Sequence, residues 1–448
     1  AFDREGGVVL APSIPLTPLA PIAGAPEPRR PTLFGHDPIE ALAEGVLDGS
    51  QPLEVLVVVG ANPVYSSPAG DRLRQALEKI PMVVAITSFQ DETAAEADLI
   101  LPSHVYLERW QGTTTTPTVA FSVLGVGQPV IEPLFDSRDP GDILLSLAGN
   151  IEGLDPEALP WPSYEAYLKN RLEGLVVSGE GTVVTGSFEE SWVHFLEERG
   201  WRFLEHKSID SFWKDLLRES SWWNSVRAKG DWQRLLPTPS GRFEFFSQDL
   251  EQELQRRGRE QTAGEFSDLE ALAIGSEAVG LAGDVDEICL PHFEPPAVEG
   301  EGELVLVPFQ PITARGALSP VSPMVMEMYG YPCDVEWRTW VELAPDTAHH
   351  LQLEDGDEVE VKSDRAAFQA VVRMQPGASP GVAHVPTGLG RSEELGGGGG
   401  EGANPVAALL AAHDSLTGDR ALVSTRVRLR LIRRRAYGGP MPLQGEHG

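Results

Sequence analysis

The residues whose types and spacing best suit ligand binding lie in the stretch VVVGANPVYSSP, which runs from Val57 to Pro68. A strand-like apolar run ends at Gly60, and an Asn-Pro pair and several small residues follow it. A turn rich in backbone N–H groups at the end of a buried strand is a common place for a bound ligand. The same residues also suit an ordinary tight turn, because Gly permits a positive φ, Asn forms a local hydrogen bond and Pro fixes φ. The stretch alone leaves both interpretations open.

Residue types argue against several other chemistries. The only two cysteines, Cys289 and Cys333, are far apart and form no CxxC motif. We therefore expect no iron–sulfur cluster, no cysteine-rich zinc site and no disulfide framework in this chain. His349 and His350 are expected at a helix end, where a metal site is a minor alternative. The loop GGGGGEG lacks the Lys and Ser/Thr of a phosphate-binding loop.

The charge of the chain restricts its partners. Its 67 acidic and 35 basic residues give a formal net charge of −32. Such a surface repels nucleic acid and anionic membrane faces, so we expect no nucleic-acid partner. No apolar run reaches the ~20 residues that a bilayer-spanning helix needs, so we expect no direct membrane span. The acidity fits an extracytoplasmic, a salt-adapted or simply a very soluble protein.

The elements that would position the Val57–Pro68 turn alternate between strand and helix. Continuous apolar runs predict buried strands at 53–60, 82–89 and 99–102. Apolar residues at helical spacing predict helices at 37–49 and 68–80. Strands that alternate with helices indicate a parallel sheet, so the first part of the chain is predicted to be an α/β domain.

The next part of the chain has a different pattern. Helical spacing and most of the tryptophans predict a helical insertion at about 154–234 that covers one side of the sheet. Within it, Trp222 and Trp223 are expected to pack in a core rather than to form a stacking platform. The stretch TPSGRFEFFS at 238–247 predicts a Gly turn followed by a strand.

From Glu303 the apolar period becomes two, and short strands separated by turns predict a β-barrel. The whole division is a connector at 1–37, an α/β domain at 38–250, a linker at 251–300, a barrel at 301–437 and a tail at 438–448. The opening AFDREGGVVLAP lacks a Met and begins in structured-looking sequence, which suggests a fragment, a split subunit or a processed chain.

Eight stretches in order resemble the C-terminal half of the molybdopterin oxidoreductase family, which belongs to the dimethyl sulfoxide reductase superfamily. They are VVVGANPVY (57–65), ETAAEADLILP (92–102), TPSGRFEFFS (238–247), LPHFEPP (290–296), ELVLVPF (303–309), WVELAPDTAHHLQLEDGDEVEVKS (340–363), PGVAHVPTGLG (380–390) and GANPVAALLAAHDSLTG (402–418). Each stretch is weak alone, but their shared order is specific.

Two stretches resemble one branch of the family most: TSFQDETAAEADLILPSHVYLERW and GQPVIEPLFDSRDPGDILLSLA. This branch holds polysulfide-reductase-like subunits and the molybdopterin-like subunits of alternative complex III and the menaquinone reductase complex. The resemblance implies a ferredoxin-like iron–sulfur subunit and a polytopic membrane quinone subunit as partners. It also implies a location in the periplasm or on the outer face of the cytoplasmic membrane, with the cytoplasm as the alternative.

The family fold implies that this chain supplies the third, α/β domain and the fourth domain, a barrel of double-psi type. The cofactor would be molybdopterin guanine dinucleotide with molybdenum or tungsten, shared with N-terminal domains outside this chain. The resemblance places nucleotide contacts at Gly60, Asn62 and Pro63, and around Ser88.

In the predicted barrel, the resemblance offers Thr313 and Arg315, Thr387 with the neighbouring Gly388, and Asn404 to the cofactor. An Arg beside a phosphate forms bidentate, charge-assisted contacts. One position departs from the family pattern. Many cofactor-binding members have an Asp where this chain has Thr87, and a hydroxyl is a weaker acceptor than a carboxylate.

Two functions follow from these residues. The chain is either the cofactor-binding C-terminal part of a molybdopterin oxidoreductase or a scaffold of the same fold that has lost its cofactor, which Thr87 favours modestly. A small-molecule binding module unrelated to redox chemistry is a third class. The first function requires Asn62, Ser88, Arg315 and Asn404 to converge on one groove.

Overall fold

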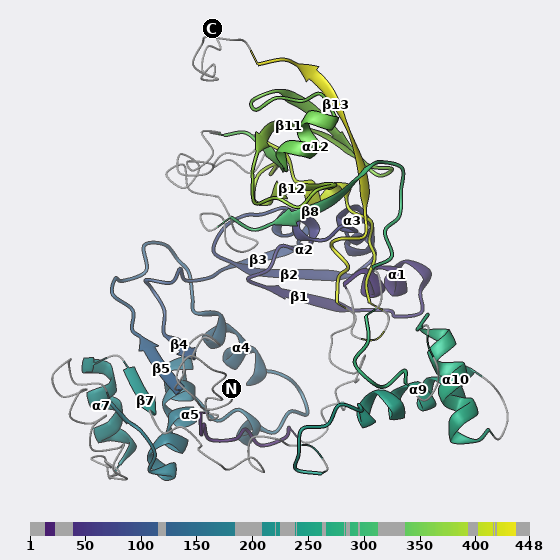
Figure 1. The fold of residues 1–448 in the computed structure, drawn as a ribbon. Coiled ribbons are helices and arrows are strands. Elements are labelled where there is room, and N and C mark those ends of the chain that lie inside the picture. The colour runs from purple at the N-terminus through teal and green to yellow at the C-terminus, as the bar shows by residue number, and fades with distance from the viewer. Residues whose placement is uncertain are drawn as a thin grey trace, which may run out of the picture. The chain divides into compact units, whose positions relative to one another are not determined.

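The computed structural model of the 448-residue chain contains two compact units (Figure 1). The first comprises residues 1–28 and 101–246, and the second comprises residues 29–100 and 247–448. The structure describes residues 14–22, 39–114, 122–183, 208–219, 221–224, 238, 240–261, 266–281, 283, 287–293, 296–311, 337–392, 402–414, 416 and 419–435.

The second unit begins with the predicted α/β layer. Its elements are α1 (Ile39–Asp48), β1 (Val55–Val59), α2 (Pro63–Ser66), α3 (Gly70–Leu77), β2 (Met82–Thr87), η1 (Ala94–Glu96) and β3 (Leu99–Pro102), whose last two residues belong to the first unit. The strands form a sheet in the order β1-β2-β3. β1 and β2 are parallel, with Val55 opposite Met82. The parallel sheet predicted from the alternating pattern is therefore confirmed.

Strand β1 differs from the expectation that both of its faces are buried. Leu56 packs against the core formed by α1 and α3. The alternate side chains Val55, Val57 and Val59 remain 52%, 42% and 43% exposed. The reason is geometric, because side chains alternate across a strand and β1 lies at the edge of the sheet.

The predicted barrel follows in the same unit. Its elements are β8 (Leu304–Phe309), β9 (Trp340–Leu343), α12 (Pro345–His350), β10 (Glu358–Lys362), β11 (Ala367–Met374), β12 (Val382–Pro386), η5 (Pro405–Ala408) and β13 (Arg426–Arg433). Six strands close in the order β10-β11-β9-β12-β8-β13. The barrel prediction is confirmed, whereas its double-psi type stays a prediction.

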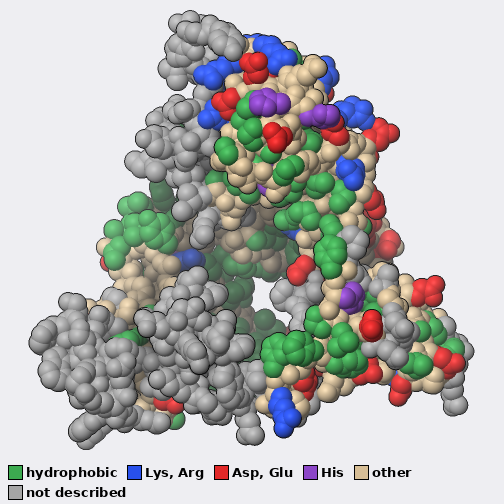
Figure 2. All heavy atoms as spheres, viewed as in Figure 1, with side chains coloured by type: hydrophobic (Ala, Val, Ile, Leu, Met, Phe, Trp, Pro, Cys, Tyr) green, Lys and Arg blue, Asp and Glu red, His purple; other side chains and the backbone are tan. Residues whose placement is uncertain are grey.

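Side chains along each barrel strand alternate between the core and the surface. Val359 and Val361 of β10 are fully buried in the barrel core. Between them, Glu360 points outward and pairs with Arg430 of β13. Acidic and basic side chains consequently lie beside one another over the barrel (Figure 2).

Residues 251–300, predicted as a linker, contain two packed helices in the described part of the second unit. These are α9 (Gln248–Gln261) and α10 (Asp268–Ala278). A Cβ added to Gly258 would lie 1.9 Å from the carbonyl oxygen of Ala271, and one added to Gly275 would lie 1.8 Å from that of Leu254. Glycine therefore allows the two helix backbones to touch, a contact that the weak apolar pattern did not reveal.

The first unit mixes helices with an antiparallel sheet. Its elements are β4 (Gln111–Thr114), β5 (Ser122–Gly127), α4 (Pro140–Ala148), η2 (Pro156–Ala158), α5 (Tyr164–Ser178), β6 (Thr182–Val183), α7 (Ile209–Glu219) and β7 (Ser221–Asn224). The sheet order is β4-β5-β7-β6. Leu168 and Leu172 of α5 pack with Trp213 and Leu216 of α7 and with Trp222.

The structure corrects two details of the insertion prediction. Trp222 and Trp223 lie in β7 rather than in a helix, although Trp222 is buried in the core as expected. The described part of 238–247 forms turns and loops rather than a strand. For Trp222 and Trp223, pairing of β7 with the distant strand β5 overrides the local helical pattern. Residues 184–207 of the predicted helical insertion lie outside the described residues.

Among the helices of the described residues, none combines the length and apolarity needed to cross a bilayer. Across the same residues, no group of three or more His, Cys, Asp and Glu side chains is placed to bind a metal ion.

Candidate functional site

The site begins at the turn that follows β1. Gly60 has a φ of +58°, in the left-handed region that favours glycine, and its N–H donates to the carbonyl of Ile86 at 2.9 Å. A Cβ at Gly60 would meet no atom within 4 Å, so the space above this turn is open. Asn62 is fully buried, and Pro63 opens α2, where a missing N–H costs no hydrogen bond.

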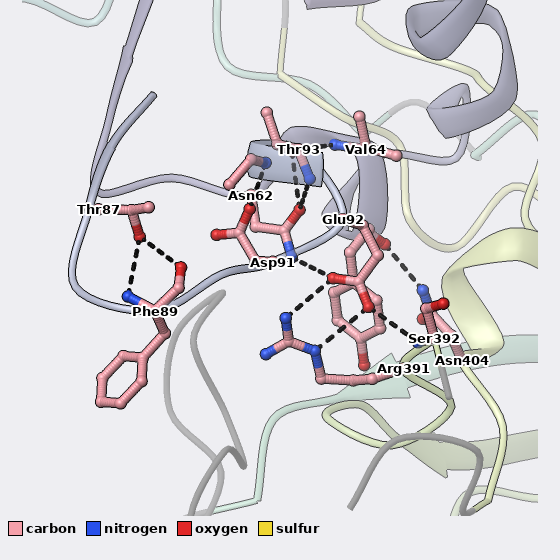
Figure 3. A network of polar contacts seen from close by, with 12 residues as sticks. Asn62, Val64, Thr87, Phe89, Asp91, Glu92, Thr93, Arg391, Ser392 and Asn404 are labelled. Carbon is pink, nitrogen blue, oxygen red and sulfur yellow. Dashed lines mark hydrogen bonds and ion pairs between the residues drawn. The ribbon is translucent and has the colours of Figure 1, made fainter. Parts of the chain in front are cut away.

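The side chain of Asn62 joins the turns that follow β1 and β2. Its Oδ1 accepts from the backbone N–H of Thr93 at 3.2 Å and from the Thr93 hydroxyl at 2.8 Å. Its Nδ2 donates to Oε2 of Glu92 at 2.6 Å (Figure 3). The amide therefore holds together two strand ends of the parallel sheet.

Glu92 extends this network into the barrel. Nη2 of Arg391 donates to its Oε2 at 3.0 Å, and the backbone N–H of Ser392 donates to its Oε1 at 3.0 Å (Figure 3). The side chains of Glu92 and Arg391 are only 9% and 5% exposed. Burial alone would raise the pKa of Glu92, but hydrogen bonds from Arg391, Asn62 and Ser392 outweigh it and hold the pKa below its ordinary value. Glu92 is therefore a buried carboxylate anion that links the α/β layer to the loop after β12.

A second link lies beside the first. The Tyr65 hydroxyl donates to the carbonyl of Leu389 at 2.7 Å, and Nδ2 of Asn404 donates to the carbonyl of Tyr65 at 2.8 Å. Burial raises the pKa of Tyr65, so its hydroxyl stays protonated. The guanidinium of Arg391 lies 5.8 Å from the centre of the Tyr65 ring, within the range of a cation–π contact.

Two buried polar atoms of this network have no partner in the described structure. One is Nη1 of Arg391, and the other is Oδ2 of Asp91. The other oxygen of Asp91 accepts from the backbone N–H of Ala94 at 2.8 Å. Burial raises the pKa of Asp91, although Ala94 and Arg391 oppose the shift. One donor and one acceptor of this network are consequently unsatisfied within the described structure.

The structure brings several of the predicted site residues together. Asn62 lies at the start of α2, and the side chain of Asn404 donates to the carbonyl of Tyr65 in α2. Gly60 and Pro63 flank Asn62 in the same turn. Thr387 follows β12, where its backbone N–H donates to the carbonyl of Phe309 at 2.8 Å.

The structure does not join the remaining predicted positions to this network. Ser88 is partly exposed at the end of β2. Beside it, the Thr87 hydroxyl donates to the carbonyl of Phe89 at 2.9 Å and so closes its own turn. Thr313 and Arg315 lie outside the described residues, so their convergence with the others stays a prediction.

Sequence reasoning missed four residues of the network: Tyr65, Asp91, Glu92 and Arg391. Asp91 and Glu92 lie in the stretch QDETAAEAD, and acidic residues alone do not indicate a site in so acidic a chain. Arg391 follows the glycine-rich turn TGLG, and a cation directly after such a turn was an available signal. Their pairing could not be read from the sequence, because Glu92 and Arg391 are 299 positions apart.

Comparisons with known proteins agree with this architecture. The family model described as molybdopterin oxidoreductase matches residues 36–150, and that described as molydopterin dinucleotide binding domain matches residues 329–421. Together the two matches include β1, β2 and most strands of the barrel.

Two relatives extend the comparison. The molybdopterin-binding-like subunit of menaquinone reductase from Nitratidesulfovibrio vulgaris is 40% identical over 116 residues, which are 26% of this chain and 16% of the relative. The molybdopterin-containing subunit of arsenate respiratory reductase from a Shewanella species is 25% identical over 359 residues, which are 78% of this chain and 40% of the relative. The chain thus spans less than half the length of these relatives.

A solved structure shares the fold. Acetylene hydratase from Pelobacter acetylenicus superposes with a TM-score of 0.56 and 17% sequence identity. The superposition covers 88% of this chain and 46% of the other. At this identity the likeness supports the fold alone.

Proposed function

This chain belongs to the molybdopterin oxidoreductase family, and from that premise we propose that it is the C-terminal part of a molybdopterin-dependent oxidoreductase subunit. In this role it binds the guanine dinucleotide ends of the pterin cofactor within an electron-transfer respiratory complex. Relatives that are named as reductase subunits support a role within a larger assembly.

One observation carries this proposal. The ion pair between Glu92 and Arg391 holds the strand-end turns of the α/β layer against the loop after β12. In parallel sheets, nucleotide ligands lie beyond the carboxyl ends of the strands. Backbone donors of the Gly60 turn and the barrel loop therefore belong to one connected site within the second unit.

The residues present fit such a cofactor. The open space over Gly60 admits a phosphate or ribose close to the backbone. The free Nη1 of Arg391 suits a phosphate or carbonyl oxygen, and the free Oδ2 of Asp91 suits a guanine N–H or a ribose hydroxyl. When bound, the metal of the cofactor would supply two-electron oxygen-atom or sulfur chemistry, while this chain would supply binding and orientation.

A second candidate function has its own supporting observation. Asn62 and Asn404 use their amide groups, and Thr87 its hydroxyl, in hydrogen bonds within the protein. A molybdopterin-like scaffold without cofactor would show the same internal use of these groups. Such a subunit would hold iron–sulfur carriers in a quinone-linked membrane complex.

Metal and nucleotide analysis of the protein, purified with all of its natural sequence and partners, separates the two functions. Molybdenum or tungsten near stoichiometry, together with GMP released by acid hydrolysis, supports cofactor binding. The absence of both metal and GMP supports the scaffold. Arg391→Gln should lower the GMP content, whereas the matched control Arg430→Gln, at an exposed ion pair on the barrel surface, should not.

The partners and location are proposed with the same function. A ferredoxin-like iron–sulfur subunit and a polytopic quinone-binding membrane subunit should copurify with the natural protein from the outer face of the cytoplasmic membrane. Protease treatment of intact spheroplasts tests the location, since an outer-face protein is cleaved and a cytoplasmic protein is protected.

The isolated chain should have no reductase activity. Half of a cofactor cradle leaves the other half of the ligand in water, so the affinity should be low. Turnover of polysulfide, thiosulfate or formate by the isolated 448 residues would contradict this expectation.

A further inference from the structure

Two loops of the first unit carry a group of exposed apolar side chains. One loop connects β3 with β4, and the other connects β5 with α4. Single apolar side chains on a surface are ordinary, whereas a group of them marks an interaction site. We call this group the loop patch, and its members are between 37% and 82% exposed: Tyr106, Leu107, Val130, Ile131, Leu134 and Phe135.

Backbone hydrogen bonds hold the two loops side by side. The carbonyl of Leu107 accepts from the backbone N–H of Val130 at 2.9 Å. Nearer the sheet, the N–H of His104 donates to the carbonyl of Arg138 at 3.2 Å, and the N–H of Arg138 donates to the carbonyl of Pro102 at 3.1 Å. The loop patch is therefore one surface that both loops build together.

The carboxylate of Glu108, a buried residue, fixes the shape of this surface. One of its oxygens accepts from the backbone N–H of Leu134 at 2.9 Å, and the other accepts from that of Val105 at 3.1 Å. These two hydrogen bonds hold the pKa of Glu108 below its ordinary value, so the carboxylate is ionised at neutral pH. A surface that is fixed in advance loses little conformational entropy when a partner binds.

The residue types of the loop patch suit a protein interface. Phe135 and Tyr106 are its most exposed aromatic side chains, at 82% and 67%. Large aromatic side chains that enter a pocket of the partner contribute much of the binding energy in protein complexes. The loop patch therefore fits a partner with an apolar groove.

The charge around the loop patch selects among apolar partners. Residues 103–110 and 128–142 contain five acidic residues and two arginines, which leave a net charge of −3 with histidine neutral. Two of the acids, Glu132 and Asp136, are exposed between or beside the apolar residues of one loop. Such a border repels anionic lipid head groups and a second copy of this chain, whose net charge is −32. It attracts a basic surface.

We propose that the loop patch docks a separate protein subunit that has an apolar groove bordered by Lys and Arg side chains. Phe135 and Leu134 enter the groove, while Glu132 and Asp136 face its basic border. An apolar centre with a charged border is typical of contacts between separate proteins, because the charges speed the encounter and the apolar centre holds the complex.

The proposal rests on the proposed function only for the existence of an assembly, and not on cofactor binding. None of the residues of the loop patch is among the candidate cofactor contacts, and all of them lie in the first unit. Metal and GMP content measures cofactor binding, whereas docking is measured by the association of the subunit. Each proposal can therefore fail while the other holds.

Photocrosslinking from within the loop patch identifies what covers it. Leu134→p-benzoylphenylalanine is made in the protein purified with all of its natural sequence and partners. Crosslinks should join position 134 to a different polypeptide, at a peptide that contains apolar residues together with Lys or Arg. The control is the same substitution at Val177, which is 80% exposed in α5 and should give no specific crosslink.

Several crosslinking results would overturn the proposal. They are crosslinks to lipid, to a second copy of this chain, to another part of the same polypeptide or to an acidic peptide. A position 134 that crosslinks no more than position 177 would overturn it as well.

Phe135→Asp tests the apolar centre of the contact. The dissociation constant for the crosslinked subunit should rise about thirtyfold or more, because a charge replaces an aromatic side chain in the groove. The matched control is Phe293→Asp, since Phe293 is 85% exposed and lies in the second unit. Both variants should keep the Tm of the wild type, which separates lost docking from misfolding. An unchanged affinity in Phe135→Asp would refute the docking site.

Charge reversal tests the basic border. Glu132→Lys combined with Asp136→Lys should lower the affinity about fivefold at low salt, and the loss should shrink at high salt because exposed charges are screened. The control is Glu152→Lys combined with Glu173→Lys, which changes the net charge equally at two exposed acids of the same unit. An affinity that rises on reversal at 132 and 136, or that falls equally in the control, would show that the partner has no basic border.

Discussion

The two units contain similar buried groups that are used in different ways. In each, an aspartate accepts a backbone N–H with one oxygen and leaves the other without a partner, namely Asp91 in the second unit and Asp139 in the first. In each, an arginine lies close enough to attract it, namely Arg391 or Arg109. The difference is a third residue, Glu92, which binds Arg391 and has no counterpart bonded to Arg109 among the described residues.

This difference separates an arginine that fastens the fold from one that has no ion pair in the described structure. With Glu92, Arg391 becomes part of a buried ion pair that joins two parts of one unit. Without such a carboxylate, Arg109 and Asp139 line a cavity of about 500 Å³, and each keeps one buried side-chain atom without a hydrogen-bond partner in the described structure. Similar charged groups can therefore join two parts of a fold or stay without an ion pair, depending on whether the protein places a third charge beside them.

The largest expected effect comes from breaking the ion pair. Arg391→Met should lower the free energy of unfolding of the second unit by about 3–5 kcal/mol, because it leaves the Glu92 carboxylate buried without its cation. Urea denaturation measures this loss, and hydrogen exchange of the backbone amides in β1 and β12 assigns it to the second unit. Arg428→Gln, at an exposed ion pair, is the control and should change little. An equally mild effect at Arg391 would show that the pair does not fasten the unit.

Glu92→Gln should cost about 1.5–3 kcal/mol at neutral pH, because charge-assisted hydrogen bonds become neutral ones. The folded-state pKa of Glu92 is lowered below 4.5, so its stabilisation is fully present above pH 4.5 and is lost as the pH falls through the folded-state value. The difference between wild type and variant should shrink in acid. A difference that stays constant from pH 7 down to strongly acidic pH would contradict this origin.

Tyr65→Phe should cost about 1 kcal/mol, because it removes the hydrogen bond to the carbonyl of Leu389 and keeps the ring in place. Thermal unfolding of the variant measures the loss. Tyr106→Phe, in an exposed residue of the first unit, provides the control. A Tyr65→Phe protein as stable as wild type would show that this second link is weaker than the ion pair beside it.

The smallest expected effect is a gain in stability in Asp139→Asn at neutral pH. Burial raises the pKa of Asp139, so its charged form destabilises the folded protein above that pKa, and a neutral amide removes this cost. The gain should vanish as the pH falls toward 3.8, where the wild-type carboxyl is protonated as well. Differential scanning calorimetry across this pH range checks the sign. A loss of stability at pH 7 would mean that Arg109 already compensates the charge of Asp139.

Sequence patterns predicted the parts of the fold that depend on local periodicity. The continuous run at β2 and the alternating residues of β10 became a buried parallel strand and a barrel strand, as predicted. Patterns failed where distant pairing decided the structure, as for Trp222 in β7 and for the glycine contacts between α9 and α10. The exposed face of β1 was also missed, because an apolar run does not reveal which strand lies at an edge.

The sequence by itself determined the parallel layer, the barrel and the turn at Gly60, because each depends on residues that are close in the chain. Tertiary structure alone decided that Asn62 is an internal hydrogen-bonding residue, that Glu92 meets Arg391, and that Asp139 and Arg109 border one cavity. The physical reason is that the partner of a buried charge is selected by packing in three dimensions, and residue type and spacing do not encode that choice locally.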